Sequence, residues 1–353
     1  MQSVSCFAPV ETRAIIAFPL ARIFYDADAD PAALRDETVA VLGYGIQGRP
    51  QALTLRDSGV TVIVGNRADA YRDQAERDGF NVLPPDAAVR RSTLILLLLP
   101  DEVQGEVFER DVKPGLTAGK ALVFAHGFAI RYRLIVLPRD VDCLLLAPRL
   151  PGHYLRERYL GGWGVPAFVS VEHDATGRAW SRLLALARAL GVTRCGAIEV
   201  SFADETELDH FSEHFTYPLI FHALEIAFDA LVDAGYPPEA ALMELHGSGE
   251  LGQVLLAASR EGLYSMIASH ASPACQVGIA HHWESAVGSS AAMRQQAEAV
   301  LESIRSGRFA RHLIGEHGRE YPELRRWRAE RSSRLEDAEA RLRAAMRRPD
   351  TTY

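Results

Sequence analysis

The chain is poor in cysteine and contains no long uninterrupted apolar run. Its 353 residues include four cysteines, Cys6, Cys143, Cys195 and Cys275, and their spacing does not match a metal-binding cluster. We expect buried free thiols in a reducing compartment, which favours a cytoplasmic location. The longest apolar stretches, such as LILLLLP, have the length of a single strand and are too short to cross a membrane.

The chain also has no excess of basic residues. The 38 Lys and Arg residues are outnumbered by 46 Asp and Glu residues, for a net charge of −8. This balance argues against nucleic acid or an acidic membrane as the main partner. The arginine-rich stretch after residue 318 carries acids at helical spacing and is expected to be a solvated, ion-paired helix. Residues 1–20 lack the pattern of a signal peptide and are interpreted as a variable leader.

The order of apolar segments divides the rest of the chain into two domains. In residues 21–200, short Val/Ile/Leu runs alternate with amphipathic stretches, which is typical of strands buried on both faces of a parallel sheet. This pattern predicts a doubly wound α/β domain of the Rossmann type. In residues 201–353 the apolar residues recur at steps of three and four, which predicts an all-helical domain. Its helices are expected near 208–235, 238–246, 250–260, 287–306 and 319–347.

The segment VAVLGYGIQG (39–48) predicts a dinucleotide site. A buried strand leads into G-x-G-x-x-G, and an amphipathic helix follows. Gly43 permits the turn, Gly45 lets the backbone approach a pyrophosphate, and Gly48 lets the helix pack close to the strand. The amides at the start of that helix, at the positive end of its dipole, would face the phosphates. A glycine turn without a ligand is the alternative interpretation.

The end of the next strand leaves the choice of dinucleotide open. A carboxylate at this point usually accepts hydrogen bonds from the adenosine ribose, whereas an arginine accommodates a 2′-phosphate. Both residue types are present, as Arg67 and Asp69. The cofactor is therefore predicted to be either NADPH or NADH.

Acids on the long helix and one histidine are the candidates for chemistry. Asp209 and Glu213 are four residues apart and share a helix face, where they repel unless a cation lies between them. Mg²⁺ prefers such oxygen ligands, although two solvated acids would give the same pattern. Glu205 and Glu207 are interpreted as acids that complement the N-terminal helix dipole. His126 follows a buried strand, where it is either an acid–base group or a histidine bonded to a loop carbonyl.

These motifs together resemble the ketol-acid reductoisomerase family of the short bacterial type, from about Ala21 to the C-terminus. The stretches that carry the resemblance include VAVLGYGIQG, LLLLPDEVQGEVF, FAHGF, DVDCLLLAPRLPGH, the run from Asp204 to Glu213, and IRSGRFARHL. The family rearranges an acetohydroxy acid with the help of Mg²⁺ and then reduces the resulting 2-keto acid with NAD(P)H, within branched-chain amino-acid synthesis. The resemblance implies the same two-domain fold, a small-molecule substrate and a homodimer or higher homo-oligomer with shared active sites.

The resemblance also assigns roles to individual residues. It implies catalytic roles for His126, Arg149, Asp209 and Glu213, and metal-binding roles for Asp209, Glu213, Glu244 and Glu250. Ser269 and Ser272 are the candidates for binding the substrate. The candidates for binding the cofactor are Gly43, Tyr44, Gly45, Gln47, Gly48, Arg67, Asp69, Pro100, Asp101 and His126.

Three departures from the family pattern fall on positions that face the substrate or the metal. Arg149 replaces a lysine and Leu150 a glycine, and an arginine is broader than a lysine and always protonated. Glu244 and Glu250 are six residues apart rather than four, with Gly247 and Gly249 between them. Ser269 aligns with the first serine of the family's substrate loop, but Ala271 replaces the second and Pro273 alters the backbone.

Three functions are consistent with this pattern. The first is a Mg²⁺- and NAD(P)H-dependent enzyme that acts on a 2-keto or acetohydroxy acid. The second is a diverged enzyme of another pathway that reduces a C=O or C=N bond without alkyl migration. The third is a non-catalytic dinucleotide-binding homologue, which the presence of His126, Asp209 and Glu213 disfavours. Because the dinucleotide half keeps its pattern, we expect hydride transfer to be retained more securely than alkyl migration.

Overall fold

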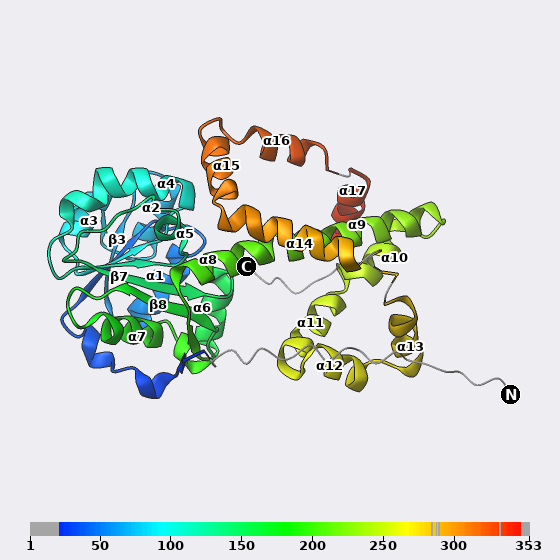
Figure 1. The fold of residues 1–353 in the computed structure, drawn as a ribbon, viewed down its shortest axis with the longest axis horizontal. Helices are drawn as coiled ribbons and strands as arrows, with labels where there is room; N and C mark the ends of the chain where they lie inside the picture. Colours follow the sequence, from blue (N-terminus) through cyan, green and yellow to red (C-terminus); the bar gives the residue numbers. More distant parts are fainter. Residues whose placement is uncertain (1–20, 284, 287, 289, 332, 347–353) are drawn as a thin grey trace.

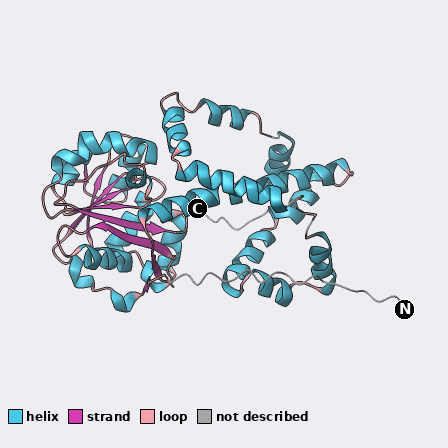
Figure 2. Ribbon diagram, in the orientation of Figure 1, coloured by secondary structure: helices cyan, strands magenta, loops and turns pink. Residues whose placement is uncertain are grey.

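The computed structural model of the chain describes residues 21–283, 285, 286, 288, 290–331 and 333–346. The predicted leader at 1–20 lies outside the described residues. A sheet-containing domain occupies one side of the molecule, and helices extend away from it on the other side (Figure 1). Figure 2 shows that the strands are confined to the first part, so the α/β-then-helical order predicted from the sequence is confirmed.

Nine described strands form one sheet in the order β1-β9-β8-β7-β6-β5-β2-β3-β4. The central strands β2, β3, β5, β6 and β7 run parallel to one another. The strands are β1 (Ile23–Phe24), β2 (Thr38–Leu42), β3 (Thr61–Gly65), β4 (Val82–Leu83), β5 (Leu94–Leu97), β6 (Ala121–Phe124), β7 (Asp142–Pro148), β8 (Ala167–His173) and β9 (Ala197–Glu199).

The sheet is not parallel throughout, which the sequence pattern did not indicate. Strand β8 pairs antiparallel with β7, and β1 pairs antiparallel with β9. β7 carries a continuous apolar run and β8 begins with one at Ala167–Val169, and burial on two faces produces such a run whichever way the strand points. The direction of β8 therefore had no signal in the sequence.

Alternate residues of each central strand enter opposite cores. Val39 and Val41 of β2 join the core under α1, α2, α6 and α7, whereas Ala40 and Leu42 join the core under α3, α4 and α5. Figure 1 shows helices above and below the sheet. The helices are α1 (Gly48–Asp57), α2 (Ala70–Arg77), α3 (Pro85–Arg90), α4 (Asp101–Val107), α5 (Phe128–Arg131), α6 (Gly152–Leu160) and α7 (Ala179–Ala189).

One long helix leads from the sheet into the helical part. It consists of α8 (Phe202–Phe211), a π-helical turn at Ser212–Thr216 and α9 (Tyr217–Asp233). The helices that follow are α10 (Pro238–Leu242) with a second π turn at Met243–Gly247, α11 (Glu250–Glu261), α12 (Leu263–His270), α13 (Pro273–His282), α14 (Ser290–Arg305), α15 (Arg308–His317), α16 (Pro322–Ala329) and α17 (Ser333–Ala345).

The boundaries of these helices differ from the prediction in two places. The helices α12, α13 and α15 were not predicted. The segment 319–347, predicted as one helix, is two helices separated after Ala329.

The prediction that all cysteines are buried is wrong for two of them. Cys143 is buried in β7, but Cys195 and Cys275 are exposed free thiols, and Cys6 lies outside the described residues. Burial among apolar neighbours raises the pKa of the Cys143 thiol, so this side chain is a packing residue.

The helix Phe202–Asp233 is, by length and composition alone, long and apolar enough to cross a membrane. Only 6% of its most apolar 18-residue window is buried inside the chain. Phe221 and Ile226 are exposed on it, and so is Tyr217. The helix therefore presents an apolar surface that no described part of the same chain covers.

Candidate functional site

The loops that carry the predicted site lie at one edge of the sheet. The glycine loop (Gly43–Gly48) follows β2, Pro100 and Asp101 follow β5, His126 follows β6, and Arg149 follows β7. Because these strands are parallel, their carboxyl ends meet at the same edge. Strands β3 and β5 lie on opposite sides of β2, so the chain reverses its direction of winding at this point, where doubly wound folds bind their ligands.

The three glycines of the loop are needed for close packing and for open space. Gly43 has a φ of +91°, and a Cβ on it would lie 2.5 Å from the carbonyl oxygen of Leu98. A Cβ on Gly48 would collide with the carbonyl oxygen of Gly43. At Gly45 nothing lies within 4 Å of a Cβ position. The loop is thus closed on the sheet side and open at the position that would face a pyrophosphate.

Tyr44 and Gln47 fix the loop from opposite sides. Tyr44 is buried, and its hydroxyl donates a hydrogen bond of 2.8 Å to Asp78, so its side chain points into the domain. Gln47 donates through Nε2 to the carbonyl oxygen of Leu150 at 3.4 Å. A Cβ on Gly152 would collide with the carbonyl oxygen of Ile46. The start of α6 therefore packs directly on the glycine loop.

Arg67 and Asp69 lie together after β3. Asp69 is the N-cap of α2, and one carboxylate oxygen accepts hydrogen bonds from the backbone amides of Tyr71 and Arg72. Its other oxygen accepts from Nε of Arg67 at 2.9 Å. The side chain of Arg67 is 86% exposed, and its remaining guanidinium donors are not used by this ion pair.

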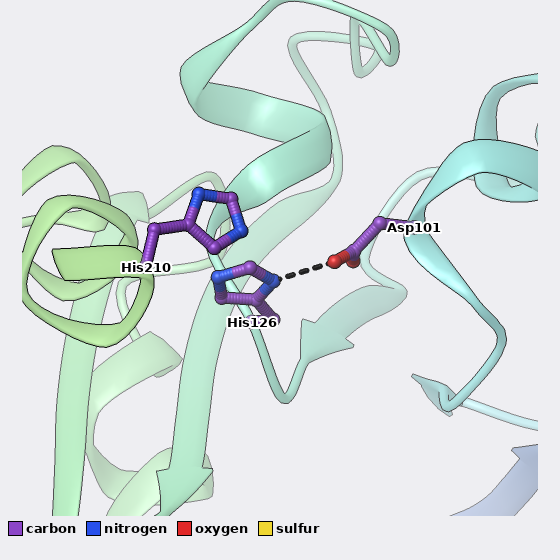
Figure 3. A group of neighbouring side chains, drawn as sticks. All are labelled: Asp101, His126 and His210. Carbon is purple, nitrogen blue, oxygen red and sulfur yellow. Dashed lines mark hydrogen bonds and ion pairs between the residues drawn. The ribbon is translucent and has the colours of Figure 1, made fainter. Parts of the chain in front are cut away.

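His126 connects the sheet edge to the helical part. Its Nδ1 lies 2.7 Å from Asp101, the first residue of α4 (Figure 3). Its Nε2 has no hydrogen-bond partner among the described residues and lies 3.6 Å from Asp209 and 4.0 Å from Glu205. Burial lowers the pKa of His126, but the hydrogen bond to Asp101 and the nearby carboxylates outweigh it and raise the pKa. The imidazole is therefore suited to hold a proton.

Glu205 belongs to the site, contrary to the prediction that it only complements a helix dipole. Its side chain is fully buried, and it accepts hydrogen bonds from the amide of Gly127 at 2.7 Å and from Arg149 at 2.8 Å. Burial raises its pKa. Glu205, Asp209 and Glu213 are spaced by four residues along one helix face, and this spacing could have indicated it. Glu207 points elsewhere and pairs with Arg131 and Arg305.

Arg149 supplies the positive charge that the acids on this helix need. Its guanidinium donates to Glu205 and to Asp209 at once and stacks over the ring of Phe168, 5.0 Å from the centroid. Ligand atoms of His126, Glu205 and Asp209 lie within 4.8 Å of one another. The donor set for a divalent cation is therefore present, but Asp209 is already paired with an arginine.

The turn after Asp209 brings further titratable groups to the site. Desolvation raises the pKa of Glu213. His210 is buried against His126, with ring centroids 4.9 Å apart (Figure 3). Burial and the two neighbouring histidines lower the pKa of His210 to about 3. His210 was missed in the sequence, although its place beside Asp209 and its spacing of four from His214 could have indicated it.

The remaining predicted residues are not brought to this edge within one chain. Glu244, in the second π turn, and Glu250, the first residue of α11, are exposed. Ser269 is exposed on α12, and Ser272 is the N-cap of α13, where its hydroxyl accepts from the amide of Cys275 at 3.3 Å. Figure 1 shows α10 to α13 on the side of the molecule away from the sheet.

Two family models match the chain. Acetohydroxy acid isomeroreductase, NADPH-binding domain, matches residues 33–196, and Ketol-acid reductoisomerase, C-terminal domain, matches residues 202–348. A ketol-acid reductoisomerase (NADP(+)) of Caldivirga maquilingensis is 39% identical over 304 residues, 84% of this chain and 90% of the relative. That of Kineococcus radiotolerans is 39% identical over 317 residues, 88% of this chain and 90% of the relative.

Solved structures agree with the sequence matches. The structure of an NADH-preferring ketol-acid reductoisomerase from an uncultured archean superposes with a TM-score of 0.88 at 35% identity, covering 93% of this chain and 100% of that chain. A semialdehyde dehydrogenase NAD-binding protein from Cupriavidus necator, at 18% identity and a TM-score of 0.57 over 77% of this chain and 99% of that chain, shares the fold alone.

Proposed function

This chain belongs to the ketol-acid reductoisomerase family and is an NAD(P)H-dependent oxidoreductase, and on that basis we propose that it acts, with the assistance of Mg²⁺, on a 2-keto or acetohydroxy acid. The observation that carries the proposal is the position of His126, between Asp101 and the acids of α8, at the sheet edge that holds the glycine loop. Hydride transfer to a carbonyl leaves an oxyanion, which a proton donor and a positive charge stabilise. His126 is the donor, and its Nε2 is the nitrogen not bonded to Asp101.

NADPH is the proposed cofactor. Asp69 uses both carboxylate oxygens in capping α2 and in pairing with Arg67, so it is poorly placed to accept from ribose hydroxyls. Arg67 extends from the same turn with free guanidinium donors, which suits a 2′-phosphate. The open space at Gly45 and the amides that begin α1 would receive the pyrophosphate.

Mg²⁺ is proposed as the second cofactor, held by Asp209 and Glu213. When bound, it would polarise the substrate carbonyl and stabilise negative charge on that oxygen. The residues fit such an ion in donor type, but Arg149 must first release Asp209. In the family pattern a second copy of the chain completes the metal site, and we propose that role for Glu244 and Glu250, which are exposed here.

A homodimer or higher homo-oligomer follows from the same reasoning. The apolar surface of α9 is uncovered within one chain, and burying it against a second copy is favourable by roughly 25 cal/mol per Å² of apolar area. A copy seated there would also bring its own exposed acids near the first chain's site.

The proposal is tested by giving the purified protein Mg²⁺ and NADPH with either 2-acetolactate or 3-hydroxy-3-methyl-2-oxobutanoate. Oxidation of NADPH with both substrates supports rearrangement and reduction. If NADPH is oxidised only with the second substrate, the protein does not catalyse the rearrangement. If NADPH is oxidised with neither substrate, the proposed substrate class is wrong. If neither substrate is reduced, calorimetry with NADPH separates a diverged homologue that still binds the cofactor from one that has lost cofactor binding.

One observation favours a second candidate, a reductase that acts on a C=O or C=N bond without alkyl migration. Alkyl migration needs a strongly polarising cation at the substrate oxygen, whereas hydride transfer needs less. The ion pairs of Arg149 with Asp209 and Glu205 hinder the binding of such a cation, but they do not involve the residues of the cofactor site.

A further inference from the structure

The segment His210-Phe211-Ser212-Glu213-His214 has the pattern H-x-x-E-H at the junction of α8 and the first π turn. Two histidines four residues apart project from the same side of a helix, and in metallopeptidases the two histidines of such a pattern bind Zn²⁺ while the adjacent glutamate acts as general base. The π turn is itself a feature that occurs often at functional sites.

The structure brings the three side chains together. One possible ligand atom each from His210, Glu213 and His214 lies within 4.8 Å of the other two. The two imidazoles stack with centroids 4.9 Å apart and an interplanar angle of 21°. Phe309 packs against both rings, with its centroid 4.1 Å from that of His214 and 5.2 Å from that of His210. The two imidazoles are thus held by packing, whereas Glu213 is exposed beside them.

A buried nitrogen without a partner indicates that packing alone does not explain this arrangement. His210 is only 4% exposed, and its Nδ1 has no hydrogen-bond partner among the described residues. A buried polar atom left unbonded costs about 1–3 kcal/mol, so native proteins seldom retain one without a ligand, a water or a functional reason. A metal ion is one such ligand for imidazole nitrogen.

The donor types select the class of metal. Mg²⁺ prefers oxygen ligands, whereas imidazole nitrogen suits Zn²⁺, Fe²⁺ and other first-row transition metals. Two histidines and one carboxylate are also the protein ligands of catalytic zinc sites that keep a position open. Arg149 pairs with Asp209 and Glu205 and with none of these three side chains.

We propose that His210, Glu213 and His214 bind a transition metal ion of the Zn²⁺ class, one helical step beyond the Arg149–Asp209 pair. Glu213 is shared with the proposed Mg²⁺ site, so the two ions compete for it. His126 and Asp101 lie on the other side of His210, where they form a second group of donors with it. The site therefore places a polarising ion next to the proton donor of the proposed reaction.

The test uses the full-length protein stripped with a chelator and titrated with Co²⁺, whose visible absorption reports nitrogen ligands, and with Zn²⁺ by calorimetry. We expect one ion per chain, bound far more tightly than Mg²⁺. His214→Asn should weaken Co²⁺ binding by roughly tenfold or more, and so should His210→Asn. His222→Asn is the matched control, because His222 is an exposed histidine of α9 outside the group.

Two results would overturn the inference. One is Co²⁺ affinity that is the same in His214→Asn as in the parent protein, with both shown to be folded by circular dichroism. The other is loss of the ion in Asp209→Asn without loss in either histidine variant, which would place it at the acid pair. In that second case the inferred site is wrong, but the proposed Mg²⁺-assisted function is unaffected. Conversely, a protein that binds Co²⁺ tightly but does not oxidise NADPH would contradict the proposed function and still support this metal site.

Discussion

Arg149 is the residue on which the chemistry of this site depends most. A lysine would present one compact ammonium to both carboxylates, whereas the planar guanidinium engages Glu205 and Asp209 through two different nitrogens. Breaking such a partly buried pair leaves two acids facing each other, so a metal ion must compensate for both losses. The arginine is therefore an internal cation that competes with any external one for Asp209.

Arg149→Lys should strengthen Mg²⁺ binding. The lysine has a single nitrogen to share between the two acids, so its hold on Asp209 is weaker, and we expect the dissociation constant for Mg²⁺ to fall by about threefold to tenfold, up to roughly 1.4 kcal/mol. Calorimetric titration measures this directly. Arg131→Lys is the control, since Arg131 pairs with Glu207 outside the site. An unchanged or weaker Mg²⁺ affinity in Arg149→Lys would show that the arginine does not compete with the metal.

Arg67 carries the proposed preference for NADPH. Arg67→Gln removes the charge beside the ribose position while leaving Asp69 as the cap of α2. The KM for NADPH should rise by roughly tenfold to a hundredfold and the KM for NADH should change little, because a charge-assisted contact to phosphate contributes about 1.5–3 kcal/mol. Arg77→Gln, on the exposed end of α2, serves as the control. Equal changes in both KM values would argue against a 2′-phosphate contact.

At the scale of elements, the sequence predicted the long helix but not the turn inside it. The three- and four-residue steps from Leu208 to Leu231 are helical, yet a π turn at Ser212–Thr216 inserts extra chain without breaking the pattern visibly. A prediction based on ideal spacing places Asp209 and Glu213 on one face, but it misses that His210 and His214 lie with them.

The start of α6 packs directly against the glycine loop that would bind the cofactor. Gly152→Ala places a methyl group against the carbonyl oxygen of Ile46, so α6 must move away from the glycine loop. We expect the dissociation constant for the dinucleotide to rise by at least about tenfold. Gly315→Ala in α15 is the matched control, because nothing lies within 4 Å of its Cβ position.

Fluorescence titration with NADPH measures this change, and thermal unfolding shows whether each variant is folded. Gly315→Ala should raise stability by up to about 1 kcal/mol, since alanine is the better helix former. Retention of full NADPH affinity in Gly152→Ala would mean that the contact between α6 and the glycine loop is not required.

For the whole molecule, the order of apolar runs predicted the two-part architecture because burial leaves a periodic trace in the sequence. Continuous runs marked seven of the nine strands, but β1 and β4 have only two residues each and leave no such trace. The antiparallel direction of β8 and the burial of Glu205 depend on contacts with distant segments. In the sequence Glu205 has the pattern of an exposed helix acid, and only the folded chain, in which Gly127 follows β6 and Arg149 follows β7, shows the contacts that bury it.

The uncovered surface of α9 is the feature that one chain does not explain. Tyr217, Phe221 and Ile226 are exposed on it, and exposed apolar side chains that group together usually mark an interaction surface. Either a membrane or a second copy would cover it, and the acidic balance of the chain disfavours an acidic membrane. The family pattern, in which two chains share a site, favours the second copy.

Phe221→Glu should therefore convert the protein to monomers. The side chain is 64% exposed on α9, and a charge there cannot be buried against another apolar helix without a cost of several kcal/mol. Light scattering should give twice the chain mass or more for the parent protein and one chain mass for the variant, with NADPH oxidation lost because Glu244 and Glu250 are no longer supplied by a partner. Val136→Glu, at a position 72% exposed in the sheet domain, should leave both mass and activity unchanged. A parent protein that is already monomeric and active would exclude a shared site, and Glu244 and Glu250 would then have no part in it.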